Sequence, residues 1–146
     1  MNQIARSSSD AFNQVDWNLV LHGFYLAFIW LSVMTPSIDE IKRRHNAAID
    51  AIRHAYGTVA DEYGATLFVS HHLDEISDTF WIKHCGVACP KPNQVLDLLV
   101  LRSHWSEDDE DGIGTFDFTL PDDITPYVIS VEFDDNGAVS SVSMES

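Results

Sequence analysis

Lys and Arg are absent from the last third of this chain, residues 103–146. The same stretch holds twelve Asp and Glu residues, which supply most of the formal net charge of −15. A segment charged so one-sidedly either repels itself into disorder or displays a negative surface to a positive partner. The charge also argues against binding to DNA, RNA or an anionic membrane, whose phosphates would be repelled.

Cysteines are scarce as well. Cys85 and Cys89 are the only two in the chain, which is too few for a disulfide framework. No cleavable apolar leader follows the first residues, so we expect reduced thiols in a cytoplasmic protein. The apolar run Trp17–Met34 is interrupted by polar residues and falls short of the roughly 20 residues that a membrane span needs. We expect a buried helix there, with a pair of strands as the alternative.

Long linkers, repeats and phosphate-binding glycine loops are also absent. Gly112-Ile113-Gly114 lacks the spacing of a phosphate loop and has no strand before it. The 45% hydrophobic and 11% aromatic content is enough for a core. We therefore expect a single domain over residues 1–146, with a helical part at about 10–101 and a β-meander at about 115–145.

The clearest helix signal begins after Pro36. Ser37 and Glu40 have the spacing of a capping box, in which each side chain bonds the backbone of the other residue. An apolar stripe then runs over Ile38–Tyr63, and Gly64 is expected to end the helix. Gly57 marks a kink or an earlier end.

The following segments are predicted less uniformly. Thr66–Ser70 is expected to be a short strand or a buried loop, and His71–Asp78 a helical turn. Phe80–Ile82 is expected in the core. Asn93 can cap a helix over Gln94–Leu101, although a strand is the alternative because the run ends in consecutive apolar residues.

From Thr115 the period of the pattern changes to two. Phe116 and Phe118 alternate with polar residues, and the same alternation recurs over 127–133 and 139–144. Asp134–Gly137 has the composition of a hairpin turn. The acidic third is therefore predicted to fold as a three-stranded antiparallel meander. The fold class that follows is α+β, with N-terminal helices packed on this C-terminal sheet.

One cluster of residues has the chemistry of a metal site. Its members are His71, His72, His84, Cys85, Cys89 and His104. Histidine and thiolate are zinc ligands, and a zinc-binding protein or metalloenzyme is the alternative function kept here. The spacing to the histidines matches no zinc pattern, however, so core packing and ordinary hydrogen bonding are favoured. We predict no metal, no cofactor and no catalytic residue.

The charged clusters suggest a binding role. Lys42–His45, the basic cluster, is either an anion site or a solvated face that also partners the acidic region. The predicted partner-binding residues are Glu107, Asp108, Asp109, Glu110, Asp111, Asp122, Asp123, Asp134 and Asp135. Such a surface can steer and dock a basic protein, or simply keep the chain soluble.

The C-terminal part also resembles a known class of protein. Residues Asn93–Ser146 contain Gln94–Leu99, the acidic loop, Phe116–Pro121 and Tyr127–Asp134. The acidic loop is Glu107–Asp111. The stretch Asn93–Ser146 resembles small bacterial immunity proteins of polymorphic toxin systems, including contact-dependent growth inhibition. The resemblance implies a non-enzymatic cytoplasmic protein that binds and blocks one cognate toxin domain. Many such toxins are basic nucleases, which suits an acidic inhibitor.

Overall fold

The structure is a computed structural model that describes residues 18, 20–23, 25, 36–107 and 111–146. The chain divides into two units, Met1–Thr35 and Pro36–Ser146. In the first unit the described residues are helical, and Val20, Leu21 and Tyr25 are exposed. Most of the run Trp17–Met34 lies outside the described residues, so its expected burial stays a prediction. No helix among the described residues is long and apolar enough to cross a membrane. The single-domain assignment stays a prediction.

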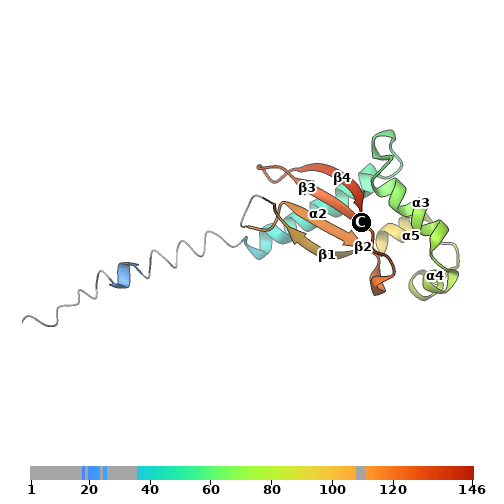
Figure 1. Cartoon of the computed structure of the whole chain (residues 1–146), viewed down its shortest axis with the longest axis horizontal. Coiled ribbons are helices and arrows are strands. Elements are labelled where there is room, and N and C mark those ends of the chain that lie inside the picture. The colour runs from blue at the N-terminus through green and yellow to red at the C-terminus, as the bar shows by residue number, and fades with distance from the viewer. Residues whose placement is uncertain (1–17, 19, 24, 26–35, 108–110) are drawn as a thin grey trace, which may run out of the picture. The chain divides into compact units, whose positions relative to one another are not determined.

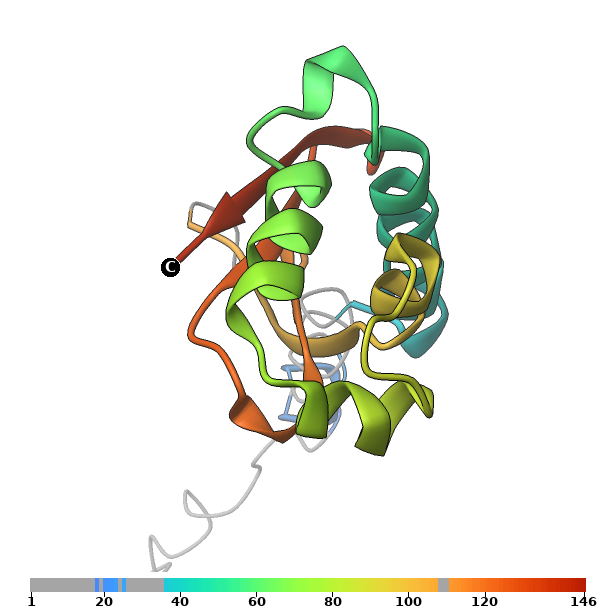
Figure 2. The ribbon, with the colours of Figure 1, turned by 90° about the vertical axis from the view of Figure 1, so that its right-hand side faces the viewer.

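The second unit is an α+β fold, which confirms the predicted class. Its elements are α2 (Ile38–Ala55), η1 (Val59–Asp61), α3 (Ala65–Glu75), α4 (Asp78–Cys85), α5 (Pro92–Asp97), β1 (Val100–Trp105), β2 (Thr115–Thr119), η2 (Pro121–Asp123), β3 (Val128–Phe133) and β4 (Val139–Glu145). The strands form one antiparallel sheet in the order β1-β2-β3-β4 (Figure 1). α3, α4 and α5 gather at one end of this unit (Figure 2).

The sheet is apolar on one face only, as the period-two pattern predicted. Phe116, Phe118, Ile129 and Val131 are fully buried and pack in the same core as Ala48 and Ile52 of α2 and Phe68 of α3. The residues between them on β2 and β3 lie on the opposite face, because successive side chains of a strand alternate. The helices therefore cover one face of the sheet, and the polar residues fall on the other.

The sheet has four strands where three were predicted. The additional strand, β1, is paired with β2 and interrupted by a bulge between Leu101 and Ser103. Leu101 pairs with Phe118 and His104 with Phe116, so these two residues share the core face although they are three positions apart. The extra residue breaks the alternation that sequence reading depends on. The predicted helix Gln94–Leu101 shrinks to α5, and its last two residues belong to the strand.

The helix after Pro36 ends earlier than its stripe suggested. Gly57 has a φ of +79° and follows the last turn of α2, so the alternative of an earlier end is confirmed. Ser37 caps the helix by accepting a hydrogen bond from Glu40 N–H at 3.1 Å. The reciprocal half of the predicted capping box is not formed, because the Glu40 carboxylate binds Arg43 and Arg44 instead.

The prediction of a strand or loop over Thr66–Ser70 is wrong, because these residues belong to α3. The buried residues Ala65, Phe68, Val69 and His72 recur at helical spacing. Ile82 was also placed wrongly, since it is 54% exposed while Phe80 and Trp81 are buried as predicted. α4 is short and buries only the side that carries Phe80 and Trp81, and Ile82 lies outside that buried side.

Asp61 starts α3. Its buried carboxylate accepts hydrogen bonds from Ala65 N–H at 3.1 Å, Thr66 N–H at 2.7 Å and Thr66 Oγ1 at 2.7 Å. Gly64 leaves the space this carboxylate needs, because a Cβ there would meet Asp61 and the Val142 carbonyl. Tyr63 O accepts from Met144 N–H at 2.9 Å, so the same turn is attached to β4.

The basic cluster attaches α2 to the acidic third of the chain. Arg44 Nη1 donates to Ile113 O at 2.8 Å, and its guanidinium lies 5.3 Å from the centre of the Phe133 ring. Arg43 Nη2 donates to Gly137 O at 2.8 Å. These arginines therefore meet backbone carbonyls of the acidic third, and the carboxylate they share is Glu40 of their own helix. The hydrogen bonds to Arg43 and Arg44 lower the pKa of Glu40 to about 2.

Replacing Asp61 tests the start of α3. Asp61→Ala leaves two backbone donors and one hydroxyl without their acceptor, so we expect a loss of about 1–3 kcal/mol in unfolding free energy. Urea unfolding followed by circular dichroism measures this. The control is Glu62→Ala at the exposed neighbouring position, which should change stability by less than about 0.5 kcal/mol. Equal midpoints for the two variants would contradict the capping role.

Candidate functional site

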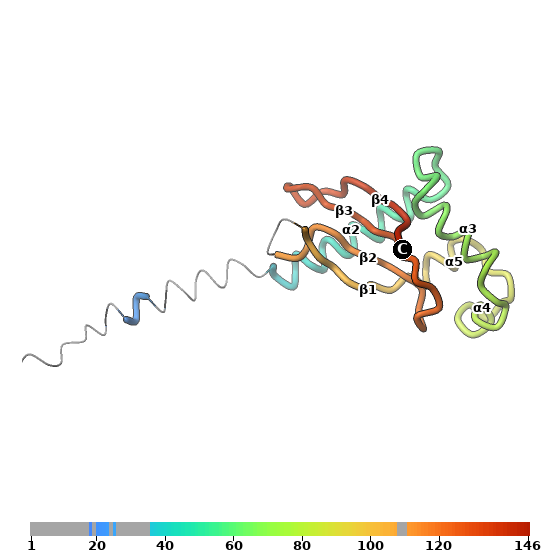
Figure 3. The backbone as a smooth tube through the Cα atoms, viewed as in Figure 1, coloured from blue at the N-terminus to red at the C-terminus, as the bar shows by residue number. Residues whose placement is uncertain are grey.

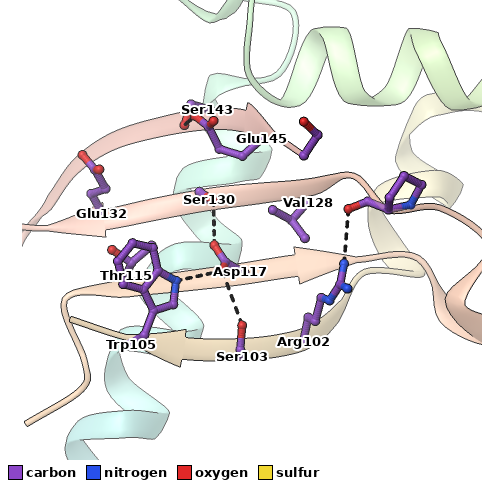
Figure 4. A pocket seen from close by; sticks show the side chains of 12 residues that line it. Arg102, Ser103, Trp105, Thr115, Asp117, Val128, Ser130, Glu132, Ser143 and Glu145 are labelled. Carbon is purple, nitrogen blue, oxygen red and sulfur yellow. Dashed lines mark hydrogen bonds between the residues drawn. The ribbon is translucent and has the colours of Figure 1, made fainter. Parts of the chain in front are cut away.

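The uncovered face of the sheet carries a groove of about 670 Å³. It crosses all four strands and is lined by Arg102, Ser103, Trp105, Thr115, Asp117, Pro126, Val128, Ser130, Glu132, Ser143, Glu145 and Ser146 (Figure 4). Its middle is formed by the smaller side chains of β2 and β3, of which Thr115, Val128 and Ser130 are buried. Its rim is formed by longer side chains.

Asp117 lies at the centre of this face and organises its neighbours. Its Oδ1 accepts a hydrogen bond from Ser130 Oγ at 2.6 Å, across to β3. Its Oδ2 accepts from Trp105 Nε1 at 2.9 Å and more weakly from Ser103 Oγ at 3.4 Å, both on β1. One carboxylate on an inner strand therefore fixes side chains on both neighbouring strands (Figure 4).

The groove is negatively charged. Asp117, Glu132 and Glu145 line it, against one basic residue, Arg102. The Arg102 guanidinium donates to Pro126 O at 3.2 Å. Glu132 accepts from Ser141 Oγ at 2.7 Å and Glu145 from Ser143 Oγ at 2.8 Å. In the described ranges, none of the three acids forms an ion pair with Lys, Arg or His.

Some of the predicted partner-binding residues come together at one end of this face. Glu107 and Asp135 line a second hollow of about 310 Å³, together with Trp105, Thr115 and Glu132, which also line the larger groove. The two hollows are therefore neighbours on this face. Glu107 and Asp135 are exposed and are twenty-eight positions apart in the chain, so only the antiparallel pairing of the strands places them side by side.

Asp122 and Asp123 lie apart from that group. The η2 turn connects β2 to β3 beside α4, at the end of the sheet opposite to the β3–β4 hairpin (Figure 3). Asp122 accepts from Lys83 Nζ and from His84 Nε2, each at 2.7 Å. These two hydrogen bonds, that of Lys83 first, lower the pKa of the Asp122 carboxyl. Its charge is already matched within the chain.

Two further predicted residues hold their own loops together. Asp134 Oδ1 accepts from Asn136 N–H at 2.9 Å and Ala138 N–H at 3.0 Å, which builds the predicted hairpin turn with Gly137 at φ +74°. Asp111 Oδ1 accepts from Ile113 N–H at 3.3 Å and Ser106 Oγ at 3.4 Å. Asp108, Asp109 and Glu110 lie outside the described residues, so their role stays a prediction.

The histidines and cysteines considered for zinc are spread over the second unit. His72 is buried, with Nδ1 2.6 Å from Phe68 O and Nε2 2.8 Å from Thr125 Oγ1. His71 packs edge-on against Tyr127, and His104 bonds Gly112 O at 2.7 Å while stacking on Phe116. Of these three histidines only His72 is buried in the core, whereas His71 is half-buried and His104 is exposed.

The remaining members of that cluster are close in sequence but do not complete a site. His84 bonds Asp122 and packs on Phe80. Cys85 is half-buried, and burial raises the pKa of its thiol, with a smaller contribution from the charge of Asp97. Cys89 is exposed. Within the part of the chain that the structure describes, no three His, Cys, Asp or Glu side chains converge as metal ligands.

Sequence reasoning singled out the loops and missed the strands of this face. Trp105, Asp117, Glu132 and Glu145 were not among the predicted partner-binding residues. A signal for two of them was present, because Asp117 and Glu132 occupy the polar positions of the period-two pattern. Trp105 carried no such signal, since the bulge in β1 disrupts its alternation.

Comparison of this chain with protein-family models, with curated proteins and with solved structures finds no match.

His72 makes the stability of the fold dependent on pH. Burial lowers the pKa of His72 below the ordinary value of 6.5. The hydrogen bond with Phe68 O raises this pKa by a smaller amount, and the charge of His71 lowers it further. The unfolded chain then binds the proton more readily, so the contribution of His72 to stability should be complete above pH 6.5 and should be lost progressively as the pH falls below it. Urea unfolding at pH 7.5 and 5.5 should show a smaller loss for His72→Asn than for the wild type. The exposed His54→Gln should keep the wild-type loss, and equal losses in all three proteins would contradict this assignment.

Proposed function

We propose that this protein is a non-enzymatic immunity protein that acts in the cytoplasm. It binds one cognate toxin domain, a basic protein such as a nuclease, and neutralises it by covering it with an acidic surface. The observation that carries the proposal is the distribution of charge: twelve acids and no Lys or Arg over residues 103–146. Most of the residues that line the sheet face left uncovered by the helices of the second unit belong to that acidic third.

Several features of the face support binding of a protein. Glu107, Glu132 and Asp135 line the same hollow there, and no Lys or Arg of the described residues lines it. Trp105 is 41% exposed beside them, and large aromatic side chains are enriched among the residues that dominate interface energies. Complementary charge raises the rate of association and disfavours wrong partners. The resemblance of residues Asn93–Ser146 to immunity proteins gives the partner its class.

The first experiment asks whether such a partner exists. Tagged full-length protein is used to capture its partner from the native cells, with washes at low and high salt. The expected result is one basic protein, retained in equal amount and released by salt, that stops growth when expressed alone and is harmless when co-expressed with this chain. A captured protein that is not toxic, or whose toxicity this chain does not relieve, would refute the proposal.

Charge reversal tests the acidic loop. Replacing Asp108, Asp109 and Asp111 with Lys should weaken binding to the toxin and flatten its dependence on salt, because fewer opposite charges attract the partner. Calorimetry at two salt concentrations measures both. The control is reversal of Asp50, Asp74 and Glu75, exposed acids on α2 and α3 that change the net charge equally. If affinity and salt slope of the loop variant match this control, the loop only aids solubility.

A further inference from the structure

One end of the open sheet face has an exposed aromatic ring among carboxylates. Trp105 is 41% exposed there, and the hollow that it lines is also lined by Glu107, Glu132 and Asp135. No Lys or Arg in the described part of the chain lines this hollow of about 310 Å³. We call these four residues, Trp105, Glu107, Glu132 and Asp135, the Trp105 site.

The indole ring is held in one orientation. Trp105 Nε1 donates to Asp117 Oδ2 at 2.9 Å, and Asp117 is itself anchored to Ser130 on the next strand. The ring therefore extends from β1 over β2 (Figure 4). A side chain fixed before binding loses less conformational entropy when a partner contacts it. The hydrogen bond uses the ring edge, which leaves the aromatic surface for contact.

The carboxylates of the Trp105 site have no cation of their own. Among the described residues, none of Glu107, Glu132 and Asp135 takes part in an ion pair. Arg102 lies on the same face but donates to Pro126 O, at the part of the groove lined by Val128. An arriving cation would therefore meet uncompensated negative charge beside an aromatic surface.

We propose that the Trp105 site binds an arginine side chain of the protein partner. The guanidinium plane stacks on the Trp105 indole, where the ring quadrupole attracts it. Its N–H groups donate to the surrounding carboxylates, which suit its planar, forked geometry. A lysine ammonium matches the charge but neither stacks as a plane nor bonds a carboxylate in a forked manner, so arginine is the preferred occupant.

A second copy of this chain is a poorer occupant. Each copy has a formal net charge of −15, so two such faces repel one another. The inference rests on the proposed function, because the arginine is taken to belong to the basic toxin domain. Beyond the proposed function, the inference names arginine as the residue type that is recognised and the Trp105 site as the place where this arginine binds.

The test uses small probes, so it does not require the toxin. Three peptides, acetyl-Gly-Arg-Gly-amide and its Lys and citrulline counterparts, are titrated into full-length ¹⁵N-labelled protein at low ionic strength. Citrulline keeps the shape of arginine without the charge. The indole N–H signal of Trp105 is assigned by its disappearance in Trp105→Phe. We expect this signal to shift saturably with the arginine peptide, less with the lysine peptide and not with the citrulline peptide.

Variants test which residues form the site. Glu132→Gln should lower the affinity for the arginine peptide by about 2- to 5-fold, the size expected for one exposed ion pair, and Trp105→Phe by a similar factor, read from backbone amides of β2. The control is Glu75→Gln, which removes the same charge from an exposed position on α3, outside the groove and the Trp105 site. It should leave the affinity nearly unchanged, and the amide spectrum of each variant confirms folding.

The outcomes separate this inference from the proposed function. Equal shifts for all three peptides, no shift, or equal loss in Glu132→Gln and Glu75→Gln would each refute the Trp105 site. A toxin that is neutralised equally well by the wild type and by Trp105→Ala would refute the site while leaving the immunity function in place. Selective arginine binding without any toxic partner would support the site and refute the function.

Discussion

Everything in the second unit depends on the alternation of side chains along β2 and β3. Burying Phe116, Phe118, Ile129 and Val131 against α2 and α3 forces the residues between them onto the opposite face. A shift of register by one residue would bring Asp117 and Glu132 into the core, where unpaired carboxylates are very costly. The hydrophobic core and the acidic face are therefore two consequences of one pairing register.

The acids of the chain are used in two ways. Asp61, Asp122 and Asp134 accept hydrogen bonds from the chain itself, and they stabilise a helix start, a turn beside α4 and a hairpin. Glu107 and Asp135 are exposed and have no cation beside them in the described part of the chain. A count of charges treats both groups alike, whereas only the second group is available to a partner without breaking internal bonds.

The sequence predicted the fold better than the site. Amphipathic spacing found α2, and period two found β2, β3 and β4, because both patterns depend on residues close in the chain. The same spacing was present in α3, where Ala65, Phe68 and His72 recur, but the short apolar run was also compatible with a strand. β1 was not predicted as a strand, because its bulge interrupts the alternation of apolar and polar residues. Trp105 was missed for the same reason.

The sequence by itself determined the α+β class, the capped start of α2, the hairpin at Gly137 and the concentration of negative charge in residues 103–146. These are local properties, set by periodicity, turn chemistry and composition. Only the tertiary structure decided which acids share a surface. It joined Glu107 to Asp135 through strand pairing, and it gave Asp122 the partners Lys83 and His84. Such neighbours are distant in the chain, and the packing of separate elements brings them together.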